Sequence, residues 1–216
     1  MRYVYCHPLF DERKCAHRFS YLLAKAFSSH NRSLERFDYR GTGEALGKFS
    51  EVTLTNLMND VFQVIDQHPV TLIGLRIGGT IALRCAVAYP QIKKLILIDP
   101  ILDGQEYVDY LMRKQHLKDM MTGLPHKHIR SSQYINIEGY KTSCQLIEEL
   151  RHLNINSSHP KVNSLPPHYI IWISQAHIEL NQDTQEVQIS APAFWERIPN
   201  AEYHNVINQI MEWCND

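Results

Sequence analysis

One stretch, residues 70–80, constrains the fold of this chain more than any other, because it joins a strand pattern to a helix pattern through closely spaced glycines. It opens with a short run rich in β-branched residues, which is typical of a strand buried inside a sheet. Gly74 follows directly, Gly78 comes four residues later, and apolar residues at helical spacing then continue up to Pro90, which must end the helix. A buried strand, a sharp turn and a helix in this order indicate a layered α/β protein. The residue at the tip of the turn is Arg76.

Strand and helix patterns alternate along the rest of the chain. Short apolar runs predict strands at residues 3–6, 33–38, 94–98, 134–138, 168–174 and 187–190. Apolar residues at helical spacing predict helices at residues 12–29, 49–66, 106–121, 141–153 and 201–213. This alternation calls for a mostly parallel central sheet with helices on both faces and right-handed crossovers.

The length and polarity of the chain favour one domain. A chain of 216 residues has room for one sizeable domain spanning residues 1–216, and not comfortably for two. Residues 101–167 are more polar than the segments around them and lie between two predicted strands of the sheet. We interpret residues 101–167 as a small helical cap inserted into the domain.

Composition and charge exclude several classes of protein. The net charge of -1 gives no electrostatic basis for binding nucleic acid or an anionic membrane. No apolar run approaches a membrane span and no secretory signal precedes the first strand, so we expect a cytoplasmic protein. The five cysteines are scattered and lack a C-x-x-C pair, which favours reduced thiols over disulfides or zinc. We expect neither a metal nor a cofactor, and the sequence is silent on the oligomeric state.

The turn at residues 74–78 has the spacing of the G-x-S-x-G nucleophile elbow, with arginine in place of serine. Arginine carries only hydrogen-bond donors and stays protonated, so it cannot attack a carbonyl carbon at neutral pH. Cys6, at the end of the first predicted strand, is the nearest alternative nucleophile. A buried cysteine in such a place is usually an inert apolar residue.

The other members of a catalytic triad also lack their usual residues. The base is expected after the last strand, where the chain carries aromatic residues, and His204 follows only later in the predicted closing helix. The acid is expected after the strand next to last, where Glu179 lies, or one strand earlier, where Asp99 and Asp103 lie. Both aspartates are also consistent with turn chemistry. The catalytic candidates are therefore Asp99, His204 and Cys6.

Four motifs stand in order along nearly the whole chain. They are His7-Pro8-Leu9-Phe10-Asp11-Glu12-Arg13 with Arg18, Asp38-Tyr39-Arg40-Gly41-Thr42-Gly43, Gly74-Leu75-Arg76-Ile77-Gly78 and Ile137-Glu138-Gly139-Tyr140-Lys141, and Pro192-Ala193-Phe194-Trp195 also fits. Together they resemble the exosortase-system-associated hydrolases, a subfamily of the α/β-hydrolase fold. The resemblance implies that fold, an arginine at the elbow, and a link to bacterial exopolysaccharide or protein-sorting loci, whereas the fold alone does not fix an activity.

Arg76 at the start of a helix needs a compensating anion, because a cation at that end costs about 0.3–1 kcal/mol. One interpretation is an internal salt bridge with Glu12, Asp99 or Asp103, all predicted at the carboxyl ends of neighbouring strands. The other is a pocket for an acidic small molecule, because helix N–H groups and a guanidinium both suit a carboxylate or phosphate. The residues expected to contact such a ligand are Arg76, Ile77, Phe10, Glu12, Asp103 and Trp195, with Phe194 and Tyr140 as further apolar walls.

Two functions remain open from the sequence. The first is a hydrolase-like protein without the usual serine nucleophile that binds an anionic small ligand or a partner at the elbow. The alternative is an active ester or thioester hydrolase with a non-standard constellation, using Cys6 or a water activated by Asp99 and His204. Such an enzyme is expected to be slow, because general-base assistance alone supplies about 10²–10⁴-fold.

Overall fold

The structure of the chain, a computed structural model, describes residues 1–123, 133–155, 165–173, 184–198 and 202–215. It divides into two compact units. The first holds Met1–Phe37, Val61–Pro100 and the described part of Asn156–Asp216, and the second holds Asp38–Asp60 and the described part of Ile101–Ile155.

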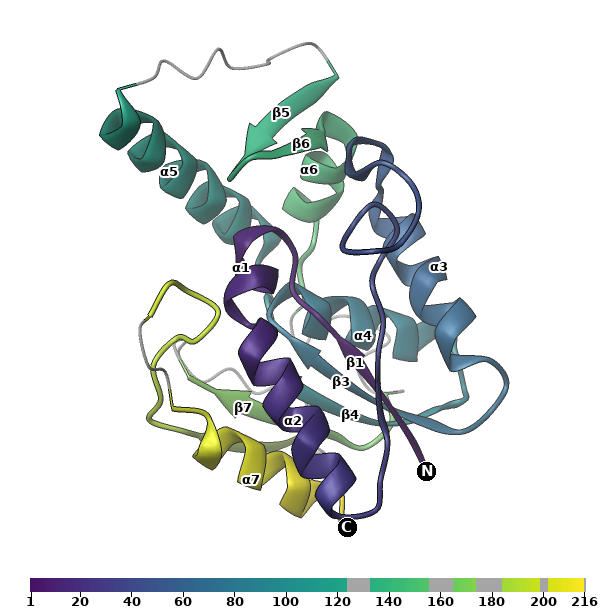
Figure 1. The fold of residues 1–216 in the computed structure, drawn as a ribbon. Helices are drawn as coiled ribbons and strands as arrows, with labels where there is room; N and C mark the ends of the chain where they lie inside the picture. Colours follow the sequence, from purple (N-terminus) through teal and green to yellow (C-terminus); the bar gives the residue numbers. More distant parts are fainter. Residues whose placement is uncertain (124–132, 156–164, 174–183, 199–201, 216) are drawn as a thin grey trace. The chain divides into compact units, whose positions relative to one another are not determined.

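The first unit is built on a parallel sheet, as the alternation of patterns predicts (Figure 1). Its strands in the described residues are β1 (Arg2–Cys6), β2 (Leu34–Arg36), β3 (Val70–Leu75), β4 (Ile92–Ile98), β7 (His168–Trp172) and β8 (Thr184–Gln188). They lie in the order β2-β1-β3-β4-β7-β8, and every pair is parallel. The carboxyl ends of all these strands therefore lie at one edge of the sheet.

Helices cover both faces of the sheet. They are α1 (Phe10–Cys15), α2 (His17–Ser29), α4 (Ile77–Ala88) and α7 (His204–Trp213), while α3 (Leu54–Ile65) carries residues of both units. Phe19, Leu23 and Phe27 recur every fourth residue of α2, and all three are fully buried. They join residues of α7 and of the strands in one apolar cluster, and α4 lies on the opposite face (Figure 1). The mostly parallel α/β architecture is thus confirmed.

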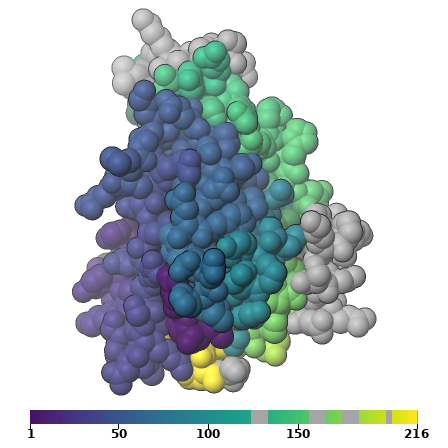
Figure 2. Space-filling view, turned by 90° about the vertical axis from the view of Figure 1, so that its right-hand side faces the viewer, coloured from purple at the N-terminus to yellow at the C-terminus, as the bar shows by residue number. Residues whose placement is uncertain are grey.

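The two ends of the chain meet at the surface of this unit. Figure 2 shows the first residues, in purple, against the C-terminal segment, in yellow. The hydroxyl of Tyr3 donates to the carbonyl oxygen of Cys214 at 3.3 Å, and Arg32 donates to the same oxygen at 3.1 Å. These contacts fasten the end of α7 to β1 and to the turn after α2.

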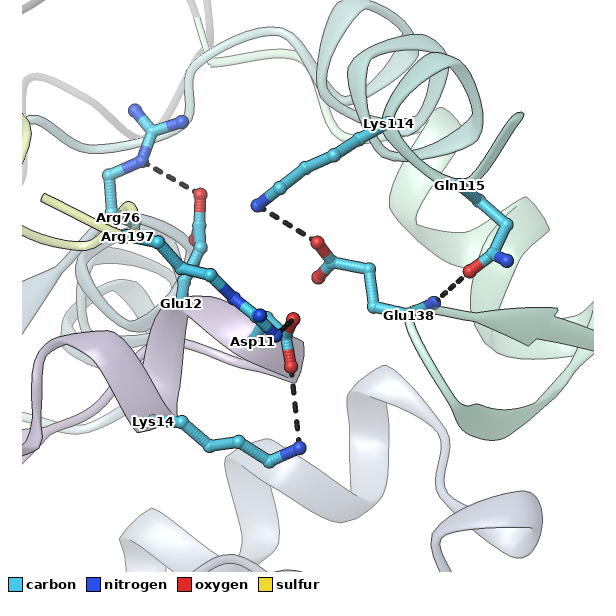
Figure 3. Close-up of polar contacts among 8 residues, drawn as sticks. All are labelled: Asp11, Glu12, Lys14, Arg76, Lys114, Gln115, Glu138 and Arg197. Atoms are coloured by element: carbon cyan, nitrogen blue, oxygen red, sulfur yellow. Dashed lines mark hydrogen bonds and ion pairs between the residues drawn. The ribbon is translucent and has the colours of Figure 1, made fainter. Parts of the chain in front are cut away.

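The second unit contains a helix pair and a hairpin. Its elements are η1 (Phe49–Glu51), α5 (Gly104–Thr122), β5 (Tyr134–Ile137), β6 (Tyr140–Ser143) and α6 (Cys144–Arg151). β5 and β6 are antiparallel, and Glu138 and Gly139 between them both have positive φ, as a two-residue type I′ turn requires. Within this unit, Lys114 of α5 forms an ion pair with Glu138 at 2.8 Å (Figure 3). In the described residues, no helix is long and apolar enough to cross a membrane.

Several predicted boundaries are wrong for local reasons. The helix predicted at residues 141–153 begins only at Cys144, because β6 uses the preceding residues to pair with β5. The helix predicted at 49–66 begins at Leu54, where Thr53 and Asn56 cap each other's backbone N–H groups. The helix predicted at 12–29 breaks at Ala16 into α1 and α2. The last strand lies at Thr184–Gln188 and not at residues 187–190.

Candidate functional site

Arg76 occupies a strained turn between β3 and α4. Its φ of 53° and ψ of -126° fall where L-residues are rare, and its N–H donates to the carbonyl oxygen of Ile98 at 2.9 Å. The turn is possible because its neighbours are glycines: a Cβ on Gly78 would collide with the backbone carbonyl of Cys6, and one on Gly74 would collide with Gly79. The turn therefore has the backbone form of a nucleophile elbow, with a guanidinium on the side chain it presents.

The guanidinium of Arg76 is held between two carboxylates. Its Nε donates to Oε1 of Glu12 at 3.3 Å (Figure 3), and its Nη1 donates to Oδ2 of Asp99 at 2.8 Å. The Arg76 side chain is 8% exposed, and both carboxylates are 0% exposed. The ring of Trp195 covers the guanidinium, with its centroid 4.9 Å from Cζ, a cation–π distance.

These groups come from the carboxyl ends of separate strands. Glu12 lies in the first turn of α1 after β1, Asp99 follows β4, and Trp195 follows β8. Phe10, Arg76 and Asp99 all have positive φ, at 53°, 53° and 44°. Non-glycine residues in this conformation are costly, and they cluster at functional sites when the surrounding structure holds them there. The strain therefore supports a functional role for this edge of the sheet.

The ionic cluster of Glu12, Arg76 and Asp99 carries two negative charges and one positive charge. Asp99 is held further by the N–H of Ile173, which donates to Oδ1 at 2.9 Å. The surplus negative charge lies at the positive end of α4, which offsets it. At that end the N–H of Ile77 makes no hydrogen bond to another described residue. The residue after the elbow supplies an oxyanion-hole donor in this type of turn.

The predicted internal salt bridge is confirmed for Glu12 and Asp99 and not for Asp103. Asp103 is exposed and belongs to the second unit, where its carboxylate caps α5 by accepting from the N–H of Glu106 at 2.9 Å. The turn chemistry expected of Asp103-Gly104 is therefore what the structure uses. The sequence suggested either a turn or a salt bridge for Asp99, and the structure shows both. Asp99 has a positive φ in the turn after β4, and its carboxylate pairs with Arg76.

The remaining catalytic candidates do not assemble into a triad. His204 is the first residue of α7 and is exposed, whereas Asp99 is fully buried and pairs with Arg76. Cys6 is fully buried in β1. Glu179 lies outside the described residues. Among the described residues, no three His, Cys, Asp or Glu side chains are arranged to hold a metal ion.

The apolar residues predicted around a ligand have other roles. Phe10 and Ile77 are buried, and Phe194 stacks on Phe19 with ring centroids 4.5 Å apart. Tyr140 belongs to the second unit, where it packs against Phe49 at 5.2 Å. Of the proposed walls, Trp195 is the one that lies against the Arg76 guanidinium, at 4.9 Å from its ring centroid to Cζ in the described residues.

Two residues next to the cluster were missed from the sequence. Asp11 precedes Glu12 in α1, and Arg197 follows Trp195 by two residues; they form an ion pair at 2.9 Å. Burial raises the pKa of the Asp11 carboxyl, but hydrogen bonds from Arg197 and Lys14 outweigh it and hold that pKa below its ordinary value. The adjacent acids Asp11-Glu12 after the first predicted strand were the available signal in the sequence.

The chain is similar to known hydrolases. The family model of serine aminopeptidase, S33, matches residues 13–163. Palmitoyl-protein thioesterase ABHD10, mitochondrial, of Bos taurus is 34% identical over 73 residues, which cover 32% of this chain and 24% of that protein. The same protein of Homo sapiens is 39% identical over 59 residues, covering 26% of this chain and 19% of that protein. The chain thus matches about a quarter of the length of these relatives or less.

Solved structures resemble nearly the whole chain. Alpha/beta hydrolase domain-containing protein 10 from mouse superposes with a TM-score of 0.59 at 16% identity, covering 99% of this chain and 89% of that chain. A structure from a study of carboxylesterases of the Thaumarchaeon Nitrososphaera gargenis gives a TM-score of 0.68 at 14% identity, covering 99% of this chain and 89% of that chain. At these identities the likeness shows the fold alone, which is that of the α/β-hydrolases.

Proposed function

Because the chain belongs to the serine aminopeptidase S33 family of α/β-hydrolases, we propose that it hydrolyses an ester or thioester, with water rather than a side chain as the nucleophile. The observation that carries the proposal is the buried ionic cluster of Glu12, Arg76 and Asp99 at the elbow. The thioesterase relatives support the substrate class, since the local likeness to them reaches 34% to 39% identity.

A covalent serine-type mechanism does not suit this elbow. Arg76 has no lone pair to attack with at neutral pH. Cys6 belongs to strand β1 and not to the elbow, and His204 is the exposed first residue of α7. A mechanism that needs only a general base and a positive charge to stabilise the oxyanion fits the ionic cluster of Glu12, Arg76 and Asp99.

Glu12 is the better base of the two carboxylates. Both oxygens of Asp99 accept hydrogen bonds, from Arg76 at 2.8 Å and from the N–H of Ile173 at 2.9 Å, which suits it to anchoring the guanidinium. The hydrogen bond from Arg76 to Glu12 is longer, at 3.3 Å, so the Glu12 carboxylate is held less tightly by the guanidinium. A carboxylate beside the elbow is suited to accepting a proton from water.

In the proposed step, a water oxygen attacks the acyl carbon while Glu12 takes one water proton. The carbonyl π electrons move onto oxygen, and this negative charge is stabilised by the N–H of Ile77 and by Arg76. The tetrahedral intermediate then expels the alcohol or thiol group as its C–O or C–S bond breaks. The proton on Glu12 passes to an alkoxide, or to solvent when a thiolate leaves. The products are a carboxylic acid and an alcohol or thiol.

The expected rate is modest. General-base catalysis contributes about 10²–10⁴-fold, and one oxyanion donor contributes about 10²–10³-fold. Without a covalent intermediate, these two effects and substrate positioning must supply the acceleration. Thioesters and activated esters, whose leaving groups depart easily, are therefore the expected substrates.

The test measures hydrolysis of p-nitrophenyl butyrate and of a short acyl thioester by the wild type and by Glu12→Gln. The amide keeps the shape of the side chain and loses the base, so turnover is expected to fall about 100-fold or more. Glu35→Gln is the matched control, because Glu35 also pairs with an arginine, Arg2 at 2.7 Å, away from the elbow on the exposed edge strand β2. Equal losses in the two variants, or none in Glu12→Gln, would reject Glu12 as the base.

A second candidate is a binding protein without hydrolytic activity that takes a small carboxylate at the elbow. The observation in its favour is the exchange of the nucleophile for Arg76, beside a helix N-terminus with an unbonded N–H among the described residues. Its weakness is electrostatic, because Glu12 and Asp99 already outnumber the guanidinium. Stabilisation of the wild type by acetate or butyrate, absent in Arg76→Ala and accompanied by no turnover, would favour binding.

The biological setting is also a proposal. The ordered motifs that resemble the exosortase-system-associated hydrolases support a place beside bacterial exopolysaccharide or protein-sorting loci. A cytoplasmic location is proposed with it, from the composition of the chain. Fractionation of the producing cell, with the protein detected by antibody, tests the location.

A further inference from the structure

Two consecutive acids of α1 bind two different arginines. Glu12 accepts from Arg76 at 3.3 Å, and Asp11 accepts from Arg197 at 2.9 Å (Figure 3). Asp11 also pairs with Lys14 at 3.3 Å, one turn further along the same helix. Helix α1 is thus tied at its first turn both to the elbow and to the segment that follows β8.

That segment, residues 191–198, carries the ring that covers Arg76. Trp195 is 1% exposed, and its neighbour Phe194 is stacked on Phe19 in the apolar cluster. Arg197 is 74% exposed at the side chain, while its partner Asp11 is 6% exposed. The segment is therefore anchored by apolar packing on one side of Trp195 and by an ion pair at the surface on the other.

The arrangement described here is closed to substrate. Glu12 and Asp99 have no exposed surface, and Arg76 is 8% exposed under the Trp195 ring. Hydrolysis requires water and an acyl group beside Glu12, so residues that bury the cluster, Trp195 among them, must move. Of the two anchors just described, the ion pair is the weaker, because a pair with a mostly exposed partner gains little from Coulomb attraction in water. The stacked Phe194 is the anchor expected to stay in place.

We propose that the Asp11–Arg197 ion pair is a latch that positions Trp195 over the ionic cluster, and that its opening admits substrate to Glu12. The admission of substrate rests on the proposed function, whereas the latch itself rests on the contacts between α1 and residues 191–198. Arg197 and Asp11 are accordingly positioning residues, which act on the cluster through Trp195.

Hydrogen–deuterium exchange of the backbone at residues 191–198 tests the latch without any activity. We expect Arg197→Ala to exchange about two- to fivefold faster than the wild type in this segment, the factor that corresponds to an ion pair of this kind. Lys14→Ala is the matched control, since it removes a cation from the same carboxylate but leaves the link between α1 and the segment. Arg197→Lys keeps the charge and should restore slow exchange.

The outcomes separate the latch from the proposed function. Faster exchange in Arg197→Ala alone, abolished by Arg197→Lys, supports the latch whether or not esters are hydrolysed. Equal exchange in Arg197→Ala and the wild type, or an equal rise in Lys14→Ala, overturns it. If the wild type hydrolyses p-nitrophenyl butyrate, Arg197→Ala should raise kcat/KM by about the same factor as it raises the exchange rate. A higher salt concentration screens the ion pair, so it should raise kcat/KM of the wild type toward the value of Arg197→Ala.

Discussion

Replacing Arg76 by alanine removes the cation that pairs with both Glu12 and Asp99, which are each 0% exposed. Removing one partner of a buried ion pair costs about 3–5 kcal/mol. Removing the unfavourable interaction of a cation with the positive end of a helix stabilises the folded protein by about 0.3–1 kcal/mol. The net loss is therefore about 2–5 kcal/mol, a large part of the total stability of about 5–15 kcal/mol that native proteins have. For a chain of this length, this lowers Tm by roughly 5–20 °C.

Urea unfolding followed by circular dichroism measures this loss, and a triple variant tests its cause. In Arg76→Ala with Glu12→Gln and Asp99→Asn, no charge remains in this cluster, and the asparagine keeps an acceptor for the N–H of Ile173. The triple variant should therefore be more stable than Arg76→Ala alone. An Arg76→Ala variant within about 1 kcal/mol of the wild type, or a triple variant no better than the single one, would refute this reasoning.

Three further predictions concern individual contacts. The Asp11 carboxyl has a lowered pKa in the folded protein. Its contribution to stability is therefore present above the unfolded pKa of about 3.9 and is lost as the pH falls through the folded pKa. The urea midpoint of the wild type should fall more between pH 5 and pH 2 than the urea midpoint of Asp11→Asn. Gly78→Ala should lose about 1–3 kcal/mol or more in the same assay, because its Cβ meets the carbonyl of Cys6. Asp103→Ala should lose about 0.5–2 kcal/mol as α5 loses its cap, with no change in ester hydrolysis.

The sheet and the elbow could be predicted from the sequence because their signals are local. Continuous apolar runs indicate strands buried on both faces, and the glycines at residues 74 and 78 mark a turn that leaves no room for a side chain. The start of α6 could not be predicted in the same way. Residues 140–143 fit a helical pattern, and they form β6 because the turn at Glu138 and Gly139 brings them against β5.

The candidate site was predictable only in part. Glu12 and Asp99 were expected near Arg76 because parallel strands end at a common edge. The sequence pattern does not distinguish Asp103 from Asp99, whereas in the structure Asp103 caps α5. The pair of Asp11 with Arg197 spans 186 positions, and no periodicity or motif relates residues that far apart. Such a contact depends on how the segment after β8 packs, which is a property of the folded chain.

The central claim is that this elbow hydrolyses an acyl substrate without forming an acyl-enzyme. The most direct test is the intact mass of the protein, quenched during turnover of p-nitrophenyl butyrate while p-nitrophenol release is followed in the same sample. We expect steady release of p-nitrophenol with no change in protein mass. A protein heavier by one butyryl group, on Cys6 or any other residue, or the absence of p-nitrophenol release above the uncatalysed rate, would contradict it.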